Sequence, residues 1–142
     1  MRGFFRKRPT EQGAADAAPG SGGTVLVVDD SPTETRIFMN ALTKAGFRVE
    51  TAQNGEEGVQ FALRHRPDLI VMDVVMPVLN GFQATRQLKS DPATADIPII
   101  IVSSKDQPTD RTWGLRQGAL DYLVKPVDTV ELIAKIRTVL GE

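Results

Sequence analysis

Short, unbroken runs of large apolar residues, separated by amphipathic segments, constrain the fold of this chain more than any other feature. Three such runs, at residues 25–28, 69–72 and 99–102, are rich in β-branched side chains. Runs of this length bounded by turn residues are typical of strands buried on both faces of a sheet. Residues 122–124 predict a further strand. Residues 48–52 alternate in polarity, and we expect them at a sheet edge.

Helical periodicity follows each predicted strand. Helices are expected near residues 55–64, 82–89 and 107–117, together with one before residue 46 and one at the end of the chain. The expected inward-facing residues of those last two are Ile37, Phe38, Ala41, Leu42 and Ala45, and Leu132, Ile133, Ile136, Val139 and Leu140. Five strand–helix repeats predict an α/β fold, a doubly wound five-stranded parallel sheet with right-handed crossovers.

The strand order depends on which strand lies at the edge. If residues 48–52 form an edge strand, the order is 2-1-3-4-5, that of flavodoxin-like (βα)5 proteins. This order is taken from those known proteins, because the sequence alone does not determine it. It makes the first and third strands neighbours at the point where the strand order reverses, and ligands bind at such points.

The first part of the chain differs in composition from the rest. Residues 10–23 contain no apolar side chain larger than alanine, so they cannot bury enough surface to offset their ordering entropy. We therefore expect a flexible basic tail and linker at residues 1–23 and a folded domain at residues 24–142. The chain has no cysteine, a formal net charge of −1 and no apolar run near the roughly 20 residues of a membrane span. These features favour a cytoplasmic protein.

Polar residues with shared chemistry terminate the predicted strands: Asp29 and Asp30, then Asp73, then Ser103, then Lys125. With the order above, the three carboxylates meet at one edge of the sheet. Two such charges 4 Å apart repel by about 4 kcal/mol at an effective dielectric constant of ~20, so a shared cation is expected. Oxygen ligands of this kind suit Mg²⁺. A carboxylate beside Mg²⁺ can act as a nucleophile toward a phosphoryl group.

Each of these residues also has a simpler structural interpretation. Residues 31–34 (Ser-Pro-Thr-Glu) fit a helix capping box with proline at the first helical position, so Asp29 and Asp30 could be only acids ahead of a helix. Asp73 could be a turn residue, Ser103 a helix cap and Lys125 a solvated charge. These interpretations weaken together because all the groups fall at the same end of the same sheet.

The residues at the strand ends resemble the receiver domain of bacterial two-component response regulators, of the CheY type. The resemblance extends from Thr24 to the end of the chain. It rests on residues 25–31, on Asp73-x-x-Met76-Pro77-x-x-Asn80-Gly81, on Ser103 and on Lys125-Pro126.

The resemblance implies a role for each matched residue. Asp73 would accept the phosphoryl group, and Mg²⁺ would be held by Asp29, Asp30, Asp73 and the backbone carbonyl of Val75. Ser103 and Lys125 would contact the phosphoryl group, Tyr122 would be an aromatic switch, and the Lys125–Pro126 peptide bond would be cis. Val75 and Lys105 occupy the positions that tune phosphoryl lifetime in this family. Neither supplies a carboxylate or amide, so we expect slow dephosphorylation.

Further segments resemble the stand-alone regulators of type IV pilus twitching motility, the PilH type: residues 31–34, 80–88, 105–107 and 113–119. This implies phosphorylation by a CheA-like histidine kinase or a phosphotransfer domain. Because the chain ends soon after Leu140, we expect no DNA-binding output domain. Output would then be a protein contact through the face of the fourth helix, fifth strand and last helix.

Three other functions compete with this one. A haloacid dehalogenase-type phosphatase needs an acid two residues after its nucleophile, and Val75 stands there. A flavodoxin-like cofactor binder needs a phosphate loop after the first strand, where Asp29 and Asp30 would repel phosphate. The remaining alternative is a receiver-like scaffold that is never phosphorylated. We expect no enzymatic activity beyond self-phosphorylation from small donors and slow loss of the phosphoryl group.

Gly114, within the fourth predicted helix, has two interpretations. It could weaken the helix by roughly 1 kcal/mol relative to alanine and so contribute to a bistable element. It could instead permit close packing beside Trp113, itself a packing residue or a partner anchor. The sequence does not separate the two.

Overall fold

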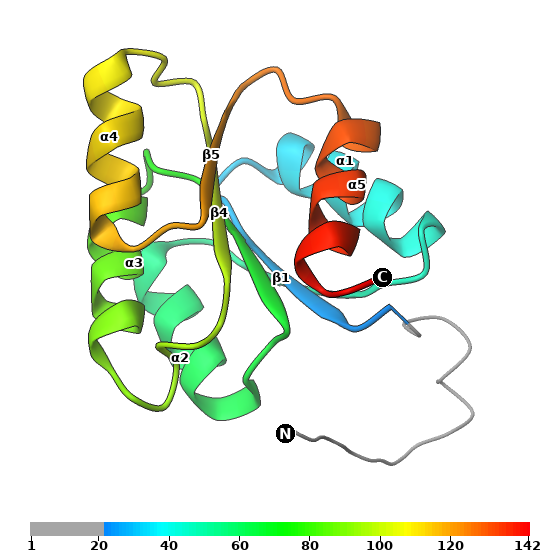
Figure 1. Ribbon diagram of the computed structural model, residues 1–142, viewed down its shortest axis with the longest axis horizontal. Coiled ribbons are helices and arrows are strands. Elements are labelled where there is room, and N and C mark those ends of the chain that lie inside the picture. Colours follow the sequence, from blue (N-terminus) through cyan, green and yellow to red (C-terminus); the bar gives the residue numbers. More distant parts are fainter. Residues whose placement is uncertain (1–21) are drawn as a thin grey trace.

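Strands and helices alternate along residues 22–142, which are the residues that this computed structural model describes (Figure 1). Their bounds follow the predicted pattern to within about one to two residues at most ends. In chain order they are β1 (Thr24–Val28), α1 (Pro32–Lys44), β2 (Arg48–Ala52), α2 (Gly55–His65), β3 (Leu69–Met72), α3 (Gly81–Ser90), β4 (Ile99–Ser103), α4 (Pro108–Gln117), β5 (Asp121–Val124) and α5 (Thr129–Val139).

The five strands form one parallel sheet in the order β2-β1-β3-β4-β5, as expected. Strands β1, β3 and β4 are almost completely buried, whereas most of β2 is accessible to solvent. The continuous apolar runs therefore occupy the interior of the sheet, and the alternating segment forms an edge, because only an edge strand can keep polar side chains in water.

Two apolar layers hold the helices against the sheet. Side chains of a strand alternate between its faces, so Leu26 and Val28 point to one layer and Val25 and Val27 to the other. The first layer packs against α2, α3 and α4, and the second against α1 and α5 (Figure 1). This arrangement leaves the carboxyl ends of all five strands at one edge of the molecule.

One detail differs from the sequence-based expectations. Ile37 was expected to face inward but is 52% exposed, because Phe38 and Leu42 alone form the buried stripe at the centre of α1. The expected tail and linker lie outside the described residues, apart from Gly22 and Gly23. These two glycines already continue the β1–β2 pairing: the Gly22 N–H donates to the Gly46 carbonyl, and the Gly23 carbonyl accepts from the Arg48 N–H.

Within the described part of the chain, no helix is both long enough and apolar enough to cross a membrane.

Candidate functional site

Backbone hydrogen bonds place the polar residues at the carboxyl edge of the sheet. The N–H groups of Asp29, Asp73 and Lys125 each donate to a carbonyl at the end of the neighbouring strand. The acceptors are Ala52 at 3.0 Å, Val28 at 2.9 Å and Ser103 at 2.9 Å, respectively. The parallel ladder thus continues by one bond past each apolar run, which brings residues distant in sequence to one edge.

The carboxylates of Asp29, Asp30 and Asp73 form a cluster in which one oxygen from each lies within 4.8 Å of the others. Asp29 and Asp73 are buried, whereas Asp30 is exposed. Burial is the largest cause that raises the pKa of Asp29, to about 6, and the charge of Asp73 adds to it. Burial also raises the pKa of Asp73, against the opposing charge of Lys125. The cluster is therefore costly in its ionised form without a cation.

Lys125 places its ammonium group beside this cluster. Its Nζ atom lies 3.4 Å from Asp29 Oδ2 and 3.5 Å from Asp73 Oδ1, and its side chain is largely buried. Burial alone would lower the pKa of Lys125. The hydrogen bond with Glu34 and the charges of Asp73 and Asp29 outweigh burial and raise this pKa. The lysine is therefore held in its charged form at the site, and the peptide bond that follows it, to Pro126, is cis as expected.

Glu34 is a member of this site that the sequence-based reasoning assigned elsewhere. The capping box predicted that its carboxylate would accept from the Ser31 N–H. That N–H instead donates to Asp29 Oδ1 at 2.9 Å, and the Glu34 carboxylate accepts a hydrogen bond from Lys125 Nζ. Only half of the box is present, since the Glu34 N–H donates to Ser31 Oγ. No local pattern could have indicated a partner 91 residues away.

The loop between β3 and α3 is closed tightly behind Asp73. The Gly81 N–H donates to the Val74 carbonyl at 2.9 Å, and a Cβ atom at Gly81 would lie 1.9 Å from the Asp73 carbonyl oxygen. Only glycine fits there without moving the backbone. The side chain of Asp73 accepts from the Val74 N–H at 2.8 Å. Gly81 thus helps to fix the backbone that carries Asp73.

Ser103, Lys105 and Tyr122 form a second group at the ends of β4 and β5. Ser103 is completely buried, and its Oγ accepts from the Lys105 N–H at 3.1 Å. The buried Tyr122 donates from its hydroxyl to the Lys105 carbonyl at 2.7 Å. Burial raises the pKa of Tyr122, and a hydrogen bond with Ser103 opposes this. The tyrosine is therefore in an inward position, tied to the loop that follows β4.

The environment of Gly114 favours close packing, although the neighbour is not Trp113. A Cβ atom at Gly114 would lie 2.9 Å from Cδ2 of Tyr122 and 3.1 Å from Cδ1 of Ile101. Trp113 is 48% exposed and points away from the core. Gly114 therefore allows α4 to lie directly against the buried tyrosine.

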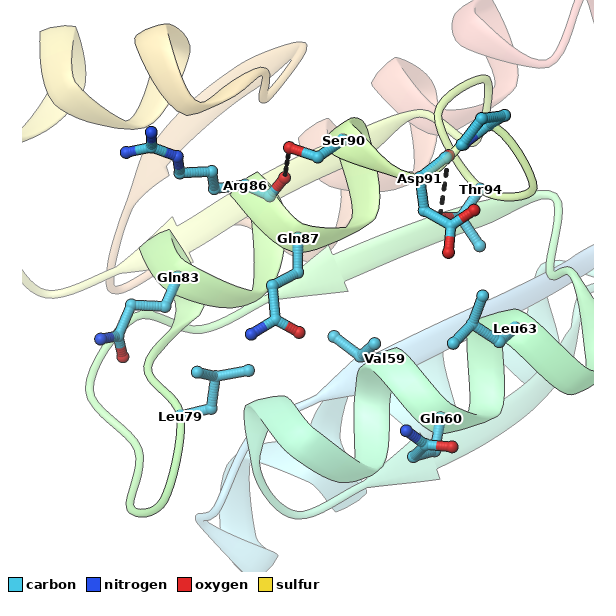
Figure 2. Close-up of a pocket in the computed structure, with 11 residues that line it drawn as sticks. Val59, Gln60, Leu63, Leu79, Gln83, Arg86, Gln87, Ser90, Asp91 and Thr94 are labelled. Atoms are coloured by element: carbon cyan, nitrogen blue, oxygen red, sulfur yellow. Dashed lines mark hydrogen bonds between the residues drawn. The ribbon is translucent and has the colours of Figure 1, made fainter.

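A pocket between α1 and the end of β2 is lined in part by Asp29 and Asp30, together with Thr35 and Arg36. A separate groove lies between α2 and α3 (Figure 2). Leu63 and Leu79 border that groove together with glutamine side chains, and no residue of the carboxylate cluster lines it. Val75, which follows Asp73 by two residues, is 61% exposed.

The donor atoms at the carboxylate cluster fit a hard divalent cation. All three side chains offer carboxylate oxygen, and the exposed Asp30 leaves one side accessible to water. Mg²⁺ prefers few protein carboxylates and retains several waters. Burial raises the pKa of both Asp29 and Asp73, so a bound cation would stabilise their ionised forms.

Comparison with known proteins agrees with this arrangement. Residues 25–137 match the model of the response regulator receiver domain. The chain is 55% identical to Protein PilH of Pseudomonas aeruginosa over 117 residues, which cover 82% of this chain and 97% of PilH. The chain is therefore similar to PilH over nearly all of that protein's length.

Solved structures of receiver domains have the same fold as this chain. The receiver domain of a sensor histidine kinase from Pseudomonas aeruginosa, with magnesium coordinated in its active-site cleft, has a TM-score of 0.79 and 33% identity, covering 84% of this chain and 99% of that one. Chemotaxis protein CheY4 of Vibrio cholerae has a TM-score of 0.76 and 33% identity, covering 82% and 97%. Receiver domains bind Mg²⁺ at an acidic site, and the cluster of Asp29, Asp30 and Asp73 fits one. The chain belongs to the response regulator receiver domain family.

Proposed function

We propose that Asp73 accepts a phosphoryl group from a histidine kinase, with Mg²⁺ bound by Asp29, Asp30, Asp73 and the backbone carbonyl of Val75. The observation that carries the proposal is the cluster of three carboxylates within 4.8 Å, beside the ammonium of Lys125. An oxygen of Asp73 forms a bond to phosphorus as the phosphorus–nitrogen bond to the donor histidine breaks. The histidine leaves as the neutral imidazole once it has taken up a proton.

The residues around Asp73 reduce the electrostatic cost of this transfer. Burial favours protonated Asp73, which is not a nucleophile, and the charge of Lys125 opposes that effect. Asp29, Asp30 and Asp73 would hold Mg²⁺, which would supply further positive charge at the site. Lys125 neutralises another phosphoryl oxygen, and the Ser103 hydroxyl donates to a third.

The switch runs through Ser103 and Tyr122. Binding the phosphoryl group draws the Ser103 hydroxyl away from the Lys105 N–H, which loosens the loop after β4. The hydrogen bond from the Tyr122 hydroxyl to the Lys105 carbonyl depends on that loop. Tyr122 then moves together with the loop, and α4, which packs on it at Gly114, shifts.

Output takes place through the face of α4, β5 and α5. Large apolar side chains of these elements and of the loop before β5 are exposed without cover from the described residues: Trp113, Leu115, Leu120, Val124 and Val130. Exposed apolar groups of this kind suit a protein partner. The phosphoryl donor is a CheA-like kinase or a phosphotransfer domain. The pathway is type IV pilus or chemotaxis-like signalling in the cytoplasm, a proposal that the similarity to PilH supports.

The acylphosphate on Asp73 is long-lived. Val75 and Lys105 occupy the two positions that tune phosphoryl lifetime in this family, and neither side chain has a carboxylate or amide that could orient a hydrolytic water. The domain that carries these functions is residues 24–142, preceded by the tail and linker at residues 1–23.

The test is the intact mass of the protein after incubation with Mg²⁺ and acetyl phosphate. Wild type should gain one phosphoryl group, whereas Asp73→Ala should gain none. EDTA should abolish the adduct. Asp106→Ala, which removes an exposed aspartate outside the cluster, is the matched control and should label like wild type. If wild type gains no phosphoryl group even with a cognate kinase, the chain is an unphosphorylated scaffold.

A further inference from the structure

Lys125 forms ion pairs with three carboxylates, those of Glu34, Asp29 and Asp73. Its ammonium donates a hydrogen bond to Glu34 and lies 3.4 Å from Asp29 and 3.5 Å from Asp73. The Lys125 side chain is only 15% exposed, so its partners are limited to the groups around it. In this state Glu34 is one of three carboxylates that share the lysine.

The local structure of α1 makes Glu34 available for this contact. In a complete capping box its carboxylate would be occupied by the Ser31 N–H. Asp29 takes that N–H instead, and the Glu34 backbone is fixed by its own bond to Ser31 Oγ. The Glu34 side chain is therefore free to extend across to the residue that follows β5.

A phosphoryl group on Asp73 needs the same ammonium. It brings close to two negative charges into a site that already holds several carboxylates. Lys125 donates a hydrogen bond to Glu34, so it must weaken that bond in order to pair with a phosphoryl oxygen. This competition for the lysine acts against phosphorylation.

We infer that Glu34 is a positioning residue that competes with the phosphoryl group for Lys125 and thereby restrains phosphorylation of Asp73. The inference rests on the proposed function and adds to it a regulatory residue outside the set of strand-end residues. Glu34 contacts neither the phosphoryl donor nor the cation in this account, and it acts only through Lys125.

Glu34→Gln tests the inference because it removes the charge and keeps the shape. With acetyl phosphate as donor, an oxygen of Asp73 bonds to phosphorus and acetate leaves. The initial rate of adduct formation, measured by intact mass at saturating Mg²⁺, should rise about threefold to fivefold, the factor for a partly exposed ion pair. Glu56→Gln removes an exposed first-turn glutamate from α2 and should leave the rate unchanged.

A double-mutant cycle with Lys125→Met separates competition for the lysine from a general effect of charge. If Glu34 acts through Lys125, Glu34→Gln should give no gain in the Lys125→Met background. The affinity for beryllofluoride, followed by ¹⁹F NMR, is an equilibrium readout. It should increase in Glu34→Gln by the same factor as the rate, even if Lys125→Met fails to fold.

Three results would overturn the inference. A Glu34→Gln rate equal to that of Glu56→Gln means that the glutamate does not restrain the reaction. An equal gain with and without Lys125 means that it acts through charge alone. A wild type that gains no phosphoryl group overturns the proposed function together with the inference, whereas the first two results leave the proposed function intact.

Discussion

At the scale of single residues, the site contains buried acids whose ionised forms are unfavourable in the metal-free protein. Asp29 has a pKa of about 6, raised from 3.8, so folding favours its protonated form. Between about pH 4 and pH 6 the folded state binds more protons than the unfolded state. This contribution to stability is fully present below the unfolded pKa and is lost as pH rises through about 6.

We predict that Asp29→Asn stabilises the metal-free protein at pH 7.5 by about 1–2 kcal/mol, because the amide mimics the protonated acid. The gain should shrink as pH falls from 6 toward 4, where Asp29 is already protonated. Urea unfolding in EDTA across this range measures it. Adding Mg²⁺ should stabilise wild type more than the variant at pH 7.5. A gain that is independent of pH would contradict the raised pKa of Asp29.

Val75 gives a second prediction at this scale. Val75 is exposed beside Asp73, where an amide could hold a water molecule against the phosphoryl group. Val75→Asn should therefore accelerate loss of the phosphoryl group severalfold. The measurement is the decay of the phosphorylated mass after removal of acetyl phosphate. Val78→Asn, an exposed valine in the same loop, is the control. A Val75→Asn variant that decays no faster than wild type would count against slow intrinsic dephosphorylation.

Local patterns predicted most of the site residues but misassigned the contact of Glu34. The apolar runs locate the strand ends, and the fold then gathers Asp29, Asp73 and Lys125. The four-residue pattern at Ser31 indicated a capping partner for Glu34, whereas its partner is 91 residues away. Sequence spacing encodes contacts within a turn of helix. It does not encode which of two competing carboxylates takes a given N–H.

At the scale of elements, α4 is held to the sheet by few buried side chains. Only Gly114 and Gln117 are buried in this helix, in contrast to four residues in α2. Arg111 adds a bond to the Tyr122 carbonyl at 2.8 Å. A helix attached so lightly beside Tyr122 is suited to shift with it. The sequence showed the glycine but not its neighbour Tyr122, because Tyr122 belongs to β5 and not to the helix.

We predict that Gly114→Ala destabilises the protein by about 1 kcal/mol. The added methyl group would meet the buried ring of Tyr122 at 2.9 Å, a clash worth about 1–3 kcal/mol, against a helix-propensity gain of about 1 kcal/mol. Urea unfolding measures the difference. Thr112→Ala, on the exposed side of the same helix, should change stability by less than about 0.5 kcal/mol. If Gly114→Ala is as stable as Thr112→Ala, α4 has room to move off the ring at no cost.

At the scale of the whole molecule, the pattern of apolar runs was sufficient for the fold class and for the edge position of β2. The order of the remaining strands came from resemblance to known proteins, because several orders bury the same runs equally well. Among the described residues, the two apolar layers take their side chains from β1 through α5, beginning at Val25. These layers cover both faces of the sheet.

We therefore predict that residues 22–142 fold and accept the phosphoryl group as the full chain does. Starting at Gly22 keeps its bond to Gly46 and the bond from the Thr24 N–H to Asp68 Oδ2 at 2.8 Å. The melting temperature should stay within about 2 °C of the full chain, a shift that corresponds to well under 1 kcal/mol. A chain that starts at Asp29 lacks β1, which pairs with both β2 and β3, and should not fold. If the 22–142 chain loses stability or labelling, residues 1–21 contribute to the domain, and its boundary lies earlier than residue 24.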